Sequence, residues 1–253
     1  MKKYADIYFT VDPWKIIEEG FDARYSRVSE SVFSLANESM GVRGCFDEGG
    51  SIDSLRGAYT NGVYDLEPLG KSYRGIIDQT HFMVPAADWL ATRIILDGEA
   101  LDLGHVRFRD FRRVLDMRAG TLERSFVWET ASGKALSLRF LRFMDMTHRE
   151  RAYQRVTMEA LNFSGAISFR AGLSFHVIHE GYRKCYWQGA RAQAAPGRLA
   201  LQASTVRSGQ QVFAGALVSL PESAEADAEG DTRRCAPPFS SGRDSRFPST
   251  AAR

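Results

Sequence analysis

Residues 121–140 read TLERSFVWETASGKALSLRF, and this stretch decides the fold class. Leu122, Arg124, Phe126 and Trp128 occupy every second position, so an extended chain places them on one face and the intervening residues on the other. A period of two is typical of half-buried β-strands. Residues 129–133 supply a turn, and the alternation resumes at residues 136–140. The stretch therefore predicts two strands joined by a short loop.

The same alternation recurs on both sides of this stretch. Upstream, Asp97-Gly98 separates two short apolar segments, and Asp-Gly is a strong hairpin signal because both turn residues need a positive φ. Downstream, residues 156–160 and 167–175 are predicted strands joined by a hairpin loop at residues 162–165. Residues 199–206 and 212–220 form a last predicted pair. Many strands with short loops predict a mainly all-β chain folded as an antiparallel sandwich.

Helical signals are few and short. Residues 14–20 are predicted to form a short helix capped by Asp12, with Pro13 at its first position and Gly20 beyond its end. Residues 147–153 are predicted to hold another helical turn. The sequence therefore predicts a β-protein with a few short helices.

The composition excludes several classes of protein. The 253 residues carry a net charge of +2 with scattered basic residues, which indicates neither a nucleic-acid nor a membrane partner. Three cysteines are an odd and sparse set that does not indicate a disulfide framework and fits a reducing compartment. The first residues do not form a secretory signal, and no long apolar run predicts a membrane span. A cytoplasmic location is expected.

The composition changes after residue 221. Residues 222–253 contain no Leu, Ile, Val or Met, so they cannot bury enough apolar surface to offset the entropy of ordering. We expect one domain over residues 1–221 and a disordered, low-complexity tail over residues 222–253. That tail is either a natural flexible segment or the product of a truncation or a reading-frame error.

The segment NESMGVRG, residues 37–44, is the first candidate binding motif. Gly41 and Gly44 sit among apolar residues, where glycine permits close backbone approach. Arg43 between them is able to donate several hydrogen bonds to neighbouring carbonyl groups. The segment is therefore either a tight strand crossing held by a buried arginine, or a contact to a sugar hydroxyl or a phosphate.

The segment YTNGVYD, residues 59–65, is the second candidate. Four side chains of this segment are of the kinds that bind carbohydrates, because aromatic faces stack on sugar rings and amides recognise hydroxyl groups. They are Tyr59, Asn61, Tyr64 and Asp65. The alternative interpretation is structural, with Tyr59 facing a core and Asn61 in a bend. Both interpretations stay open at this point.

Other potential chemistry is weak. His176 and His179 lie in what reads as a strand, where a spacing of three puts them on opposite faces, so no metal site is expected. Asp47-Glu48 and Asp110 with Asp116 offer acids for glycoside chemistry, but acids are common in any chain of this kind. Asp116 is also suited to cap a turn that Gly120 closes. No cofactor motif is present, and no cofactor is expected.

Three blocks follow one another in the chain: ESVFSLANESMGVRG, GAYTNGVYD, and a long block that begins LDGEALDLGHVRFRDF. In this order they resemble the N-terminal domain of glycoside hydrolase family 65, which contains maltose, trehalose and kojibiose phosphorylases; Cys45 departs from the family pattern. The resemblance implies a large antiparallel β super-sandwich, followed in the family by a helical linker and an (α/α)6 catalytic barrel. The barrel carries the general acid, and inorganic phosphate is the co-substrate of an inverting phosphorolysis of an α-glucoside. No catalytic residue is carried over to this chain.

Two functions are therefore expected as alternatives. The first is the non-catalytic N-terminal domain of a disaccharide phosphorylase or hydrolase, inactive by itself, with a helical barrel as its partner and a homodimer as a further assembly. The second is a stand-alone carbohydrate-binding sandwich that takes a glucoside.

Overall fold

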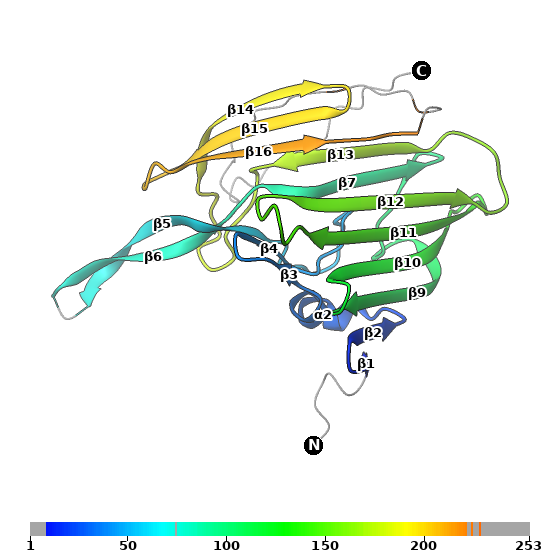
Figure 1. The fold of residues 1–253 in the computed structure, drawn as a ribbon, viewed down its shortest axis with the longest axis horizontal. Helices are drawn as coiled ribbons and strands as arrows, with labels where there is room; N and C mark the ends of the chain where they lie inside the picture. Colours follow the sequence, from blue (N-terminus) through cyan, green and yellow to red (C-terminus); the bar gives the residue numbers. More distant parts are fainter. Residues whose placement is uncertain (1–8, 74, 222–223, 225–227, 229–253) are drawn as a thin grey trace.

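The structure is a computed structural model that describes residues 9–73, 75–221, 224 and 228. The tail expected over residues 222–253 therefore lies, apart from residues 224 and 228, outside the described residues. The described chain is mainly β, with antiparallel pairing throughout (Figure 1). No helix in these residues is long and apolar enough to cross a membrane.

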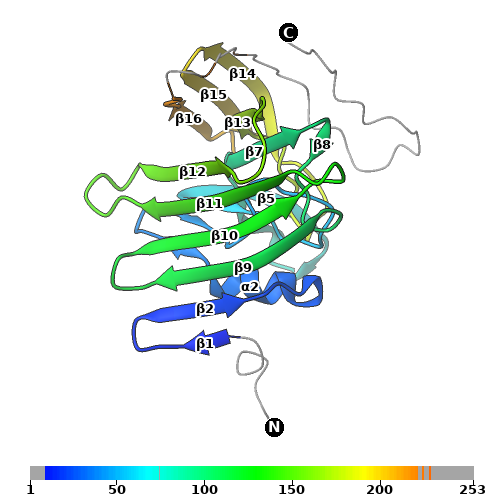
Figure 2. The same cartoon turned by 90° about the vertical axis from the view of Figure 1, so that its right-hand side faces the viewer.

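The largest sheet has six strands in the order β1-β2-β9-β10-β11-β12. Its central strands obey the predicted alternation: in β10 every second side chain, from Leu122 to Trp128, is buried. Figure 2 faces this sheet, with β5 and the helix α2 behind it. The strand bounds are β1 (Phe9–Val11), β2 (Lys15–Glu19), β9 (Arg107–Asp116), β10 (Thr121–Glu129), β11 (Ala135–Met144) and β12 (Ala152–Ala160).

Three smaller sheets complete the described fold. Their strand orders are β13-β7-β8, β14-β15-β16 and β3-β4-β5-β6, and the long β5–β6 hairpin extends away from the rest of the chain (Figure 1). The bounds are β3 (Leu35–Ala36), β4 (Met40–Val42), β5 (Ala58–Tyr73), β6 (Ile77–Pro85), β7 (Asp88–Leu96), β8 (Glu99–Ala100), β13 (Ser168–Ser174), β14 (Trp187–Ala195), β15 (Arg198–Thr205) and β16 (Gln211–Leu217).

The main core lies between the six-stranded sheet and the β7–β8 hairpin. Ile94 and Leu96 of β7 pack into one cluster with Phe126, Trp128 and other buried residues of the large sheet. Sheet therefore faces sheet, as the predicted sandwich requires. The mainly antiparallel β fold class is confirmed.

Two predicted turns are confirmed in detail. Asp97 and Gly98 have φ of 54° and 77°, and they join β7 to β8. Asp116 accepts hydrogen bonds from the backbone N–H groups of Arg118 and Ala119, at 3.0 and 2.9 Å, and Gly120 has a φ of 66°.

The predicted helix over residues 14–20 is wrong. Asp12 caps a tight turn instead, with its Oδ1 2.8 Å from the N–H of Trp14, and β2 pairs on one side with β1 and on the other with β9. This pairing supplies long-range hydrogen bonds that an isolated helix of this length cannot match. The turn predicted over residues 147–153 is not helical either, since residues 147–151 lie in the loop of the β11–β12 hairpin and residues 152 and 153 begin β12.

The predicted hairpin across residues 162–165 is also wrong. β12 pairs with β11 in the large sheet, whereas β13 pairs with β7 in another sheet, so this loop crosses between sheets. Neither the helix α2 (Ser26–Val32) nor the short 3-10 helix η1 (Ala23–Tyr25) was predicted from the sequence. α2 buries Ser26, Ser29 and Glu30, so it lacks the apolar stripe by which helices are recognised.

Candidate functional site

The residues that follow β4, residues 43–50, lie against the inner face of the six-stranded sheet. Three arginines project from that face, Arg113 on β9, Arg124 on β10 and Arg142 on β11, with side chains 2%, 4% and 5% exposed. Arg113 and Arg124 lie directly opposite each other in the strand register. A buried face that carries three guanidinium groups needs matching anions close by.

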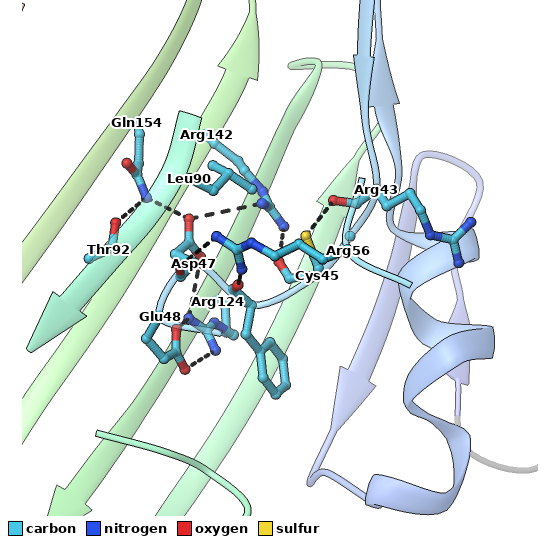
Figure 3. Close-up of polar contacts among 12 residues, drawn as sticks. Arg43, Cys45, Asp47, Glu48, Arg56, Leu90, Thr92, Arg124, Arg142 and Gln154 are labelled. Carbon is cyan, nitrogen blue, oxygen red and sulfur yellow. Dashed lines mark hydrogen bonds and ion pairs between the residues drawn. The ribbon is translucent and has the colours of Figure 1, made fainter. Parts of the chain in front are cut away.

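Three carboxylates supply the matching charge. Arg124 holds both oxygens of Glu48, with Nη1 2.8 Å from Oε1, and its Nη2 lies 3.3 Å from Oδ2 of Asp47 (Figure 3). The Nε atom of Arg113 donates to Oε2 of Glu18 at 2.8 Å. Arg142 lies 3.9 Å from Oδ1 of Asp47. Three positive and three negative groups therefore form one buried network.

Neutral groups complete this network. The Nη1 atom of Arg113 donates to the carbonyl oxygen of Gly44 at 2.8 Å, and Nη2 of Arg142 donates to that of Cys45 at 2.7 Å. Gln154 of β12 donates to Oδ1 of Asp47 at 2.7 Å (Figure 3). The network thus attaches residues 44–48 to four adjacent strands of the sheet, β9 to β12.

The electrostatics follow from burial and pairing. Burial by itself lowers the pKa of Arg124, but the Glu48 carboxylate outweighs this effect and the pKa is raised overall. Burial lowers the pKa of Arg113, and the attraction of Glu18 offsets only part of that change. The Arg124 guanidinium also lies 4.3 Å from the ring centres of Phe46 and Phe140. The pairs are therefore held in a dry, aromatic environment.

This arrangement is suited to stabilising the fold rather than to catalysing a reaction on a sugar. The cavity beside the three arginines measures about 10 Å³, with room for roughly one water molecule. Asp47 and Glu48, which the sequence offered as acids for glycoside chemistry, are both occupied by guanidinium groups. An acid–base pair for glycoside chemistry must reach a glycosidic bond in an open cleft.

Arg43, the first predicted binding residue, points away from this network toward α2 (Figure 3). Its Nη2 lies 2.9 Å from the hydroxyl of Ser31 and 3.3 Å from the carbonyl oxygen of Arg27. The neighbouring Gly44 allows close approach, because a Cβ atom there would lie 2.6 Å from the Cβ of Phe33. These contacts fit the structural interpretation of this motif, and a sugar or phosphate contact by Arg43 stays a prediction.

The second motif is distributed over different partners. Asp65 is fully buried, and its carboxylate accepts hydrogen bonds from the backbone N–H groups of residues 206, 207 and 208 in the turn after β15, at 2.9–3.2 Å. Asn61 donates to the carbonyl oxygen of Glu38 at 3.3 Å. Tyr59 is half-buried in β5, and Tyr64 is 40% exposed. Carbohydrate contact by these four side chains stays a prediction.

The model of the glycosyl hydrolase family 65 N-terminal domain matches residues 16–241. The chain belongs to this family.

Relatives with assigned names are disaccharide phosphorylases. The α,α-trehalose phosphorylase of Thermoanaerobacter brockii is 32% identical over 176 residues, which cover 67% of this chain and 22% of that protein. The maltose phosphorylase of Bacillus subtilis is 32% identical over 184 residues, 71% of this chain and 24% of the relative. A solved structure described as a putative kojibiose phosphorylase from the human microbiome matches with a TM-score of 0.80 and 33% identity, over 86% of this chain and 29% of that chain. The chain thus spans about a quarter of the length of these relatives.

A second polar cluster in this family 65 domain lies between the β5–β6 hairpin and the loop before β14. Glu67 of β5 pairs with Lys184, accepts a hydrogen bond from the Tyr186 hydroxyl at 3.2 Å and lies 3.5 Å from Arg207. The hydrogen bond from Lys184 lowers the pKa of Glu67, against the effect of burial. The pKa of Tyr186 is raised, first by burial and then by the Glu67 carboxylate. The cluster joins segments that lie far apart in the sequence, so no local pattern predicts it.

The two histidines of residues 176–179 lie beyond the end of β13, so their assignment to a strand is wrong. His179 packs against the rings of Phe82 and Tyr182, and burial lowers its pKa. Within residues 9–73 and 75–221, no group of three or more His, Cys, Asp or Glu side chains is placed to hold a metal ion.

The arginine network of the family 65 domain did have a signal in the sequence. Arg113, Arg124 and Arg142 each stand two positions from buried apolar residues on the same strand face. A charge on the inward face of an alternating strand must find a buried partner. The alternation along the strands identifies the buried arginines, but it does not show which acidic residues pair with them.

Proposed function

We propose that this chain is the non-catalytic N-terminal domain of a family 65 disaccharide phosphorylase or hydrolase. In such an enzyme a separate helical barrel performs inverting phosphorolysis of an α-glucoside, with inorganic phosphate as co-substrate and no other cofactor. The relatives named trehalose and maltose phosphorylase, of which the chain spans about a quarter, support this assignment. The proposed cellular location is the cytoplasm.

The proposal depends on the contacts of Asp47 and Glu48, whose carboxylates are both held by buried arginines. A general acid must hold a proton at neutral pH and reach the leaving oxygen. The side chain of Glu48 is fully buried and both of its oxygens are held by Arg124, so the carboxylate is out of reach of a sugar. Asp47 and Glu48 therefore stabilise the fold of the domain.

The role of the domain is then to support its helical partner and the assembly of the enzyme, including a homodimer. The β5–β6 hairpin suits this role, because it extends from the body of the fold (Figure 1) and leaves Ile76 and Ile77 85% and 49% exposed. Two-stranded ribbons are marginal in water by themselves. Contact with a partner would cover this apolar end and stabilise it.

The test is incubation of the chain with maltose, trehalose or kojibiose and inorganic phosphate, followed by an enzymatic assay for glucose 1-phosphate. We expect no release above a blank without protein. Release that grows in proportion to the concentration of the chain would refute a non-catalytic role.

The second candidate, a stand-alone carbohydrate-binding module, is favoured by the exposure of Tyr64, whose ring is open enough to stack on a sugar. It predicts saturable binding of a glucoside that Tyr59→Ala or Tyr64→Ala removes. Calorimetry that detects no heat with any glucoside would eliminate it.

A further inference from the structure

A second cavity lies where α2 meets residues 46–56, and it measures about 280 Å³. Its wall combines four polar residues, Ser26, Glu30, Ser54 and Arg56, with the apolar side chains of Phe46 and Ile52. This volume is at the lower end of the range for small-molecule sites, which fits one sugar-sized ring and not two.

The charged groups of this wall are fixed and compensated. The carboxylate of Glu30 accepts hydrogen bonds from the Ser54 hydroxyl and from the N–H of Leu55, the latter at 2.8 Å, and Arg43 lies 3.9 Å away. Arg56 is held by both carboxylate oxygens of Asp88. Each charge in the wall thus has an opposite charge behind it, which favours a neutral ligand over an ion.

Ser26 is the group that this packing leaves free. It is 6% exposed and lines the cavity, yet its hydroxyl makes no hydrogen bond with any residue that the structure describes. This hydroxyl lies at the wall of the cavity, where its donor and its acceptor sites are available to a bound molecule. A ligand hydroxyl in the cavity would satisfy it.

We propose that this cavity binds a neutral polyhydroxylated molecule of monosaccharide size. Ser26 and the outer lone pairs of Glu30 would read hydroxyl groups, and Phe46 with Ile52 would receive the apolar face of the ring. The proposal goes beyond the non-catalytic role and does not rest on it, because a scaffold domain and a catalytic one are equally able to hold this ligand.

The probe is D-glucose, titrated into the full chain and followed by saturation-transfer difference NMR. We expect transfer to the sugar protons with a dissociation constant in the millimolar range. Ser26→Ala removes one hydrogen bond, worth about 1 kcal/mol, and should weaken binding about 5-fold. Ser26→Met fills the cavity and should abolish transfer. Ser137→Ala, a half-buried serine on β11 outside the cavity, is the matched control and should bind as the wild type does.

Four results would overturn the proposal. The first is no transfer to glucose at concentrations up to about 50 mM, where even a weak site would respond. The second is unchanged binding in both Ser26 variants while their thermal unfolding shows that they are folded. The third is binding that Tyr64→Ala removes and Ser26→Met does not, which would place the sugar on β5 instead. Inorganic phosphate serves as the charged comparison, and tighter binding of phosphate than of glucose would contradict a neutral ligand.

Discussion

The pair formed by Arg124 and Glu48 gives the sharpest prediction for stability. Arg124→Met keeps an unbranched side chain of similar length but leaves the Glu48 carboxylate, whose side chain is 0% exposed, without either of its charged hydrogen bonds. Removing one partner of a buried pair costs about 3–5 kcal/mol. Asp47 keeps Arg142 and Gln154, so most of the loss should come from Glu48. A domain with about 5–15 kcal/mol of total stability would lose a large share of it.

Urea unfolding, followed by tryptophan fluorescence, measures this loss. The matched control is Arg139→Met, which breaks a surface pair with Glu123 on the outer face of β11, where Arg139 is 59% exposed, and which should cost less than about 1 kcal/mol. The double variant Arg124→Met with Glu48→Met should be more stable than Arg124→Met alone, because it no longer buries an unpaired charge. An Arg124→Met variant that loses no more than Arg139→Met would refute the reasoning.

Three further predictions concern the turns and the glycines of the motifs. Asp65→Ala should cost about 2 kcal/mol and speed amide exchange across residues 205–209, because three backbone N–H groups lose their buried acceptor; unchanged exchange there would count against a capping role. Gly44→Ala should destabilise the domain by about 1–3 kcal/mol, since its Cβ would lie 2.6 Å from that of Phe33, while Gly41→Ala, whose nearest neighbour is at 3.4 Å, should be milder in the same urea assay. Burial raises the pKa of Asp102, but backbone hydrogen bonds outweigh it and hold the pKa below its usual value, so its contribution is present above about pH 4 and is lost as the pH falls further. Asp102→Asn should accordingly lose less stability than the wild type between pH 5 and pH 2, and equal losses would contradict this.

The strands were predictable because their signal is local. In β10 the alternation from Leu122 to Trp128 is visible within nine residues. The two residues Asp97 and Gly98 are enough to predict the turn that they form. The hairpin assigned to residues 162–165 failed for the opposite reason, since the sheet that a strand joins depends on pairing with distant residues such as those of β7. The alternation of apolar residues shows that a strand exists, but it does not show which other strand pairs with it.

The buried network shows the same limit for the site. Arg124 lies 76 and 77 positions from Glu48 and Asp47, and Arg113 lies 95 positions from Glu18, so no spacing rule connects them. The arginines break the apolar pattern of their strands, which is a usable sign of a buried partner. The cavity at Ser26 had no comparable sign, because it is formed by a helix whose buried residues are polar.

We propose that Asp47 and Glu48 stabilise the fold of this domain and take no part in a reaction. The most direct measurement is glucose 1-phosphate formation from maltose and phosphate by the wild-type chain and by Glu48→Gln, with the unfolding free energy of both determined in parallel. We expect no product from either protein and a clear loss of stability in Glu48→Gln. Product formation by the wild type that disappears in a Glu48→Gln variant of unchanged stability would contradict it.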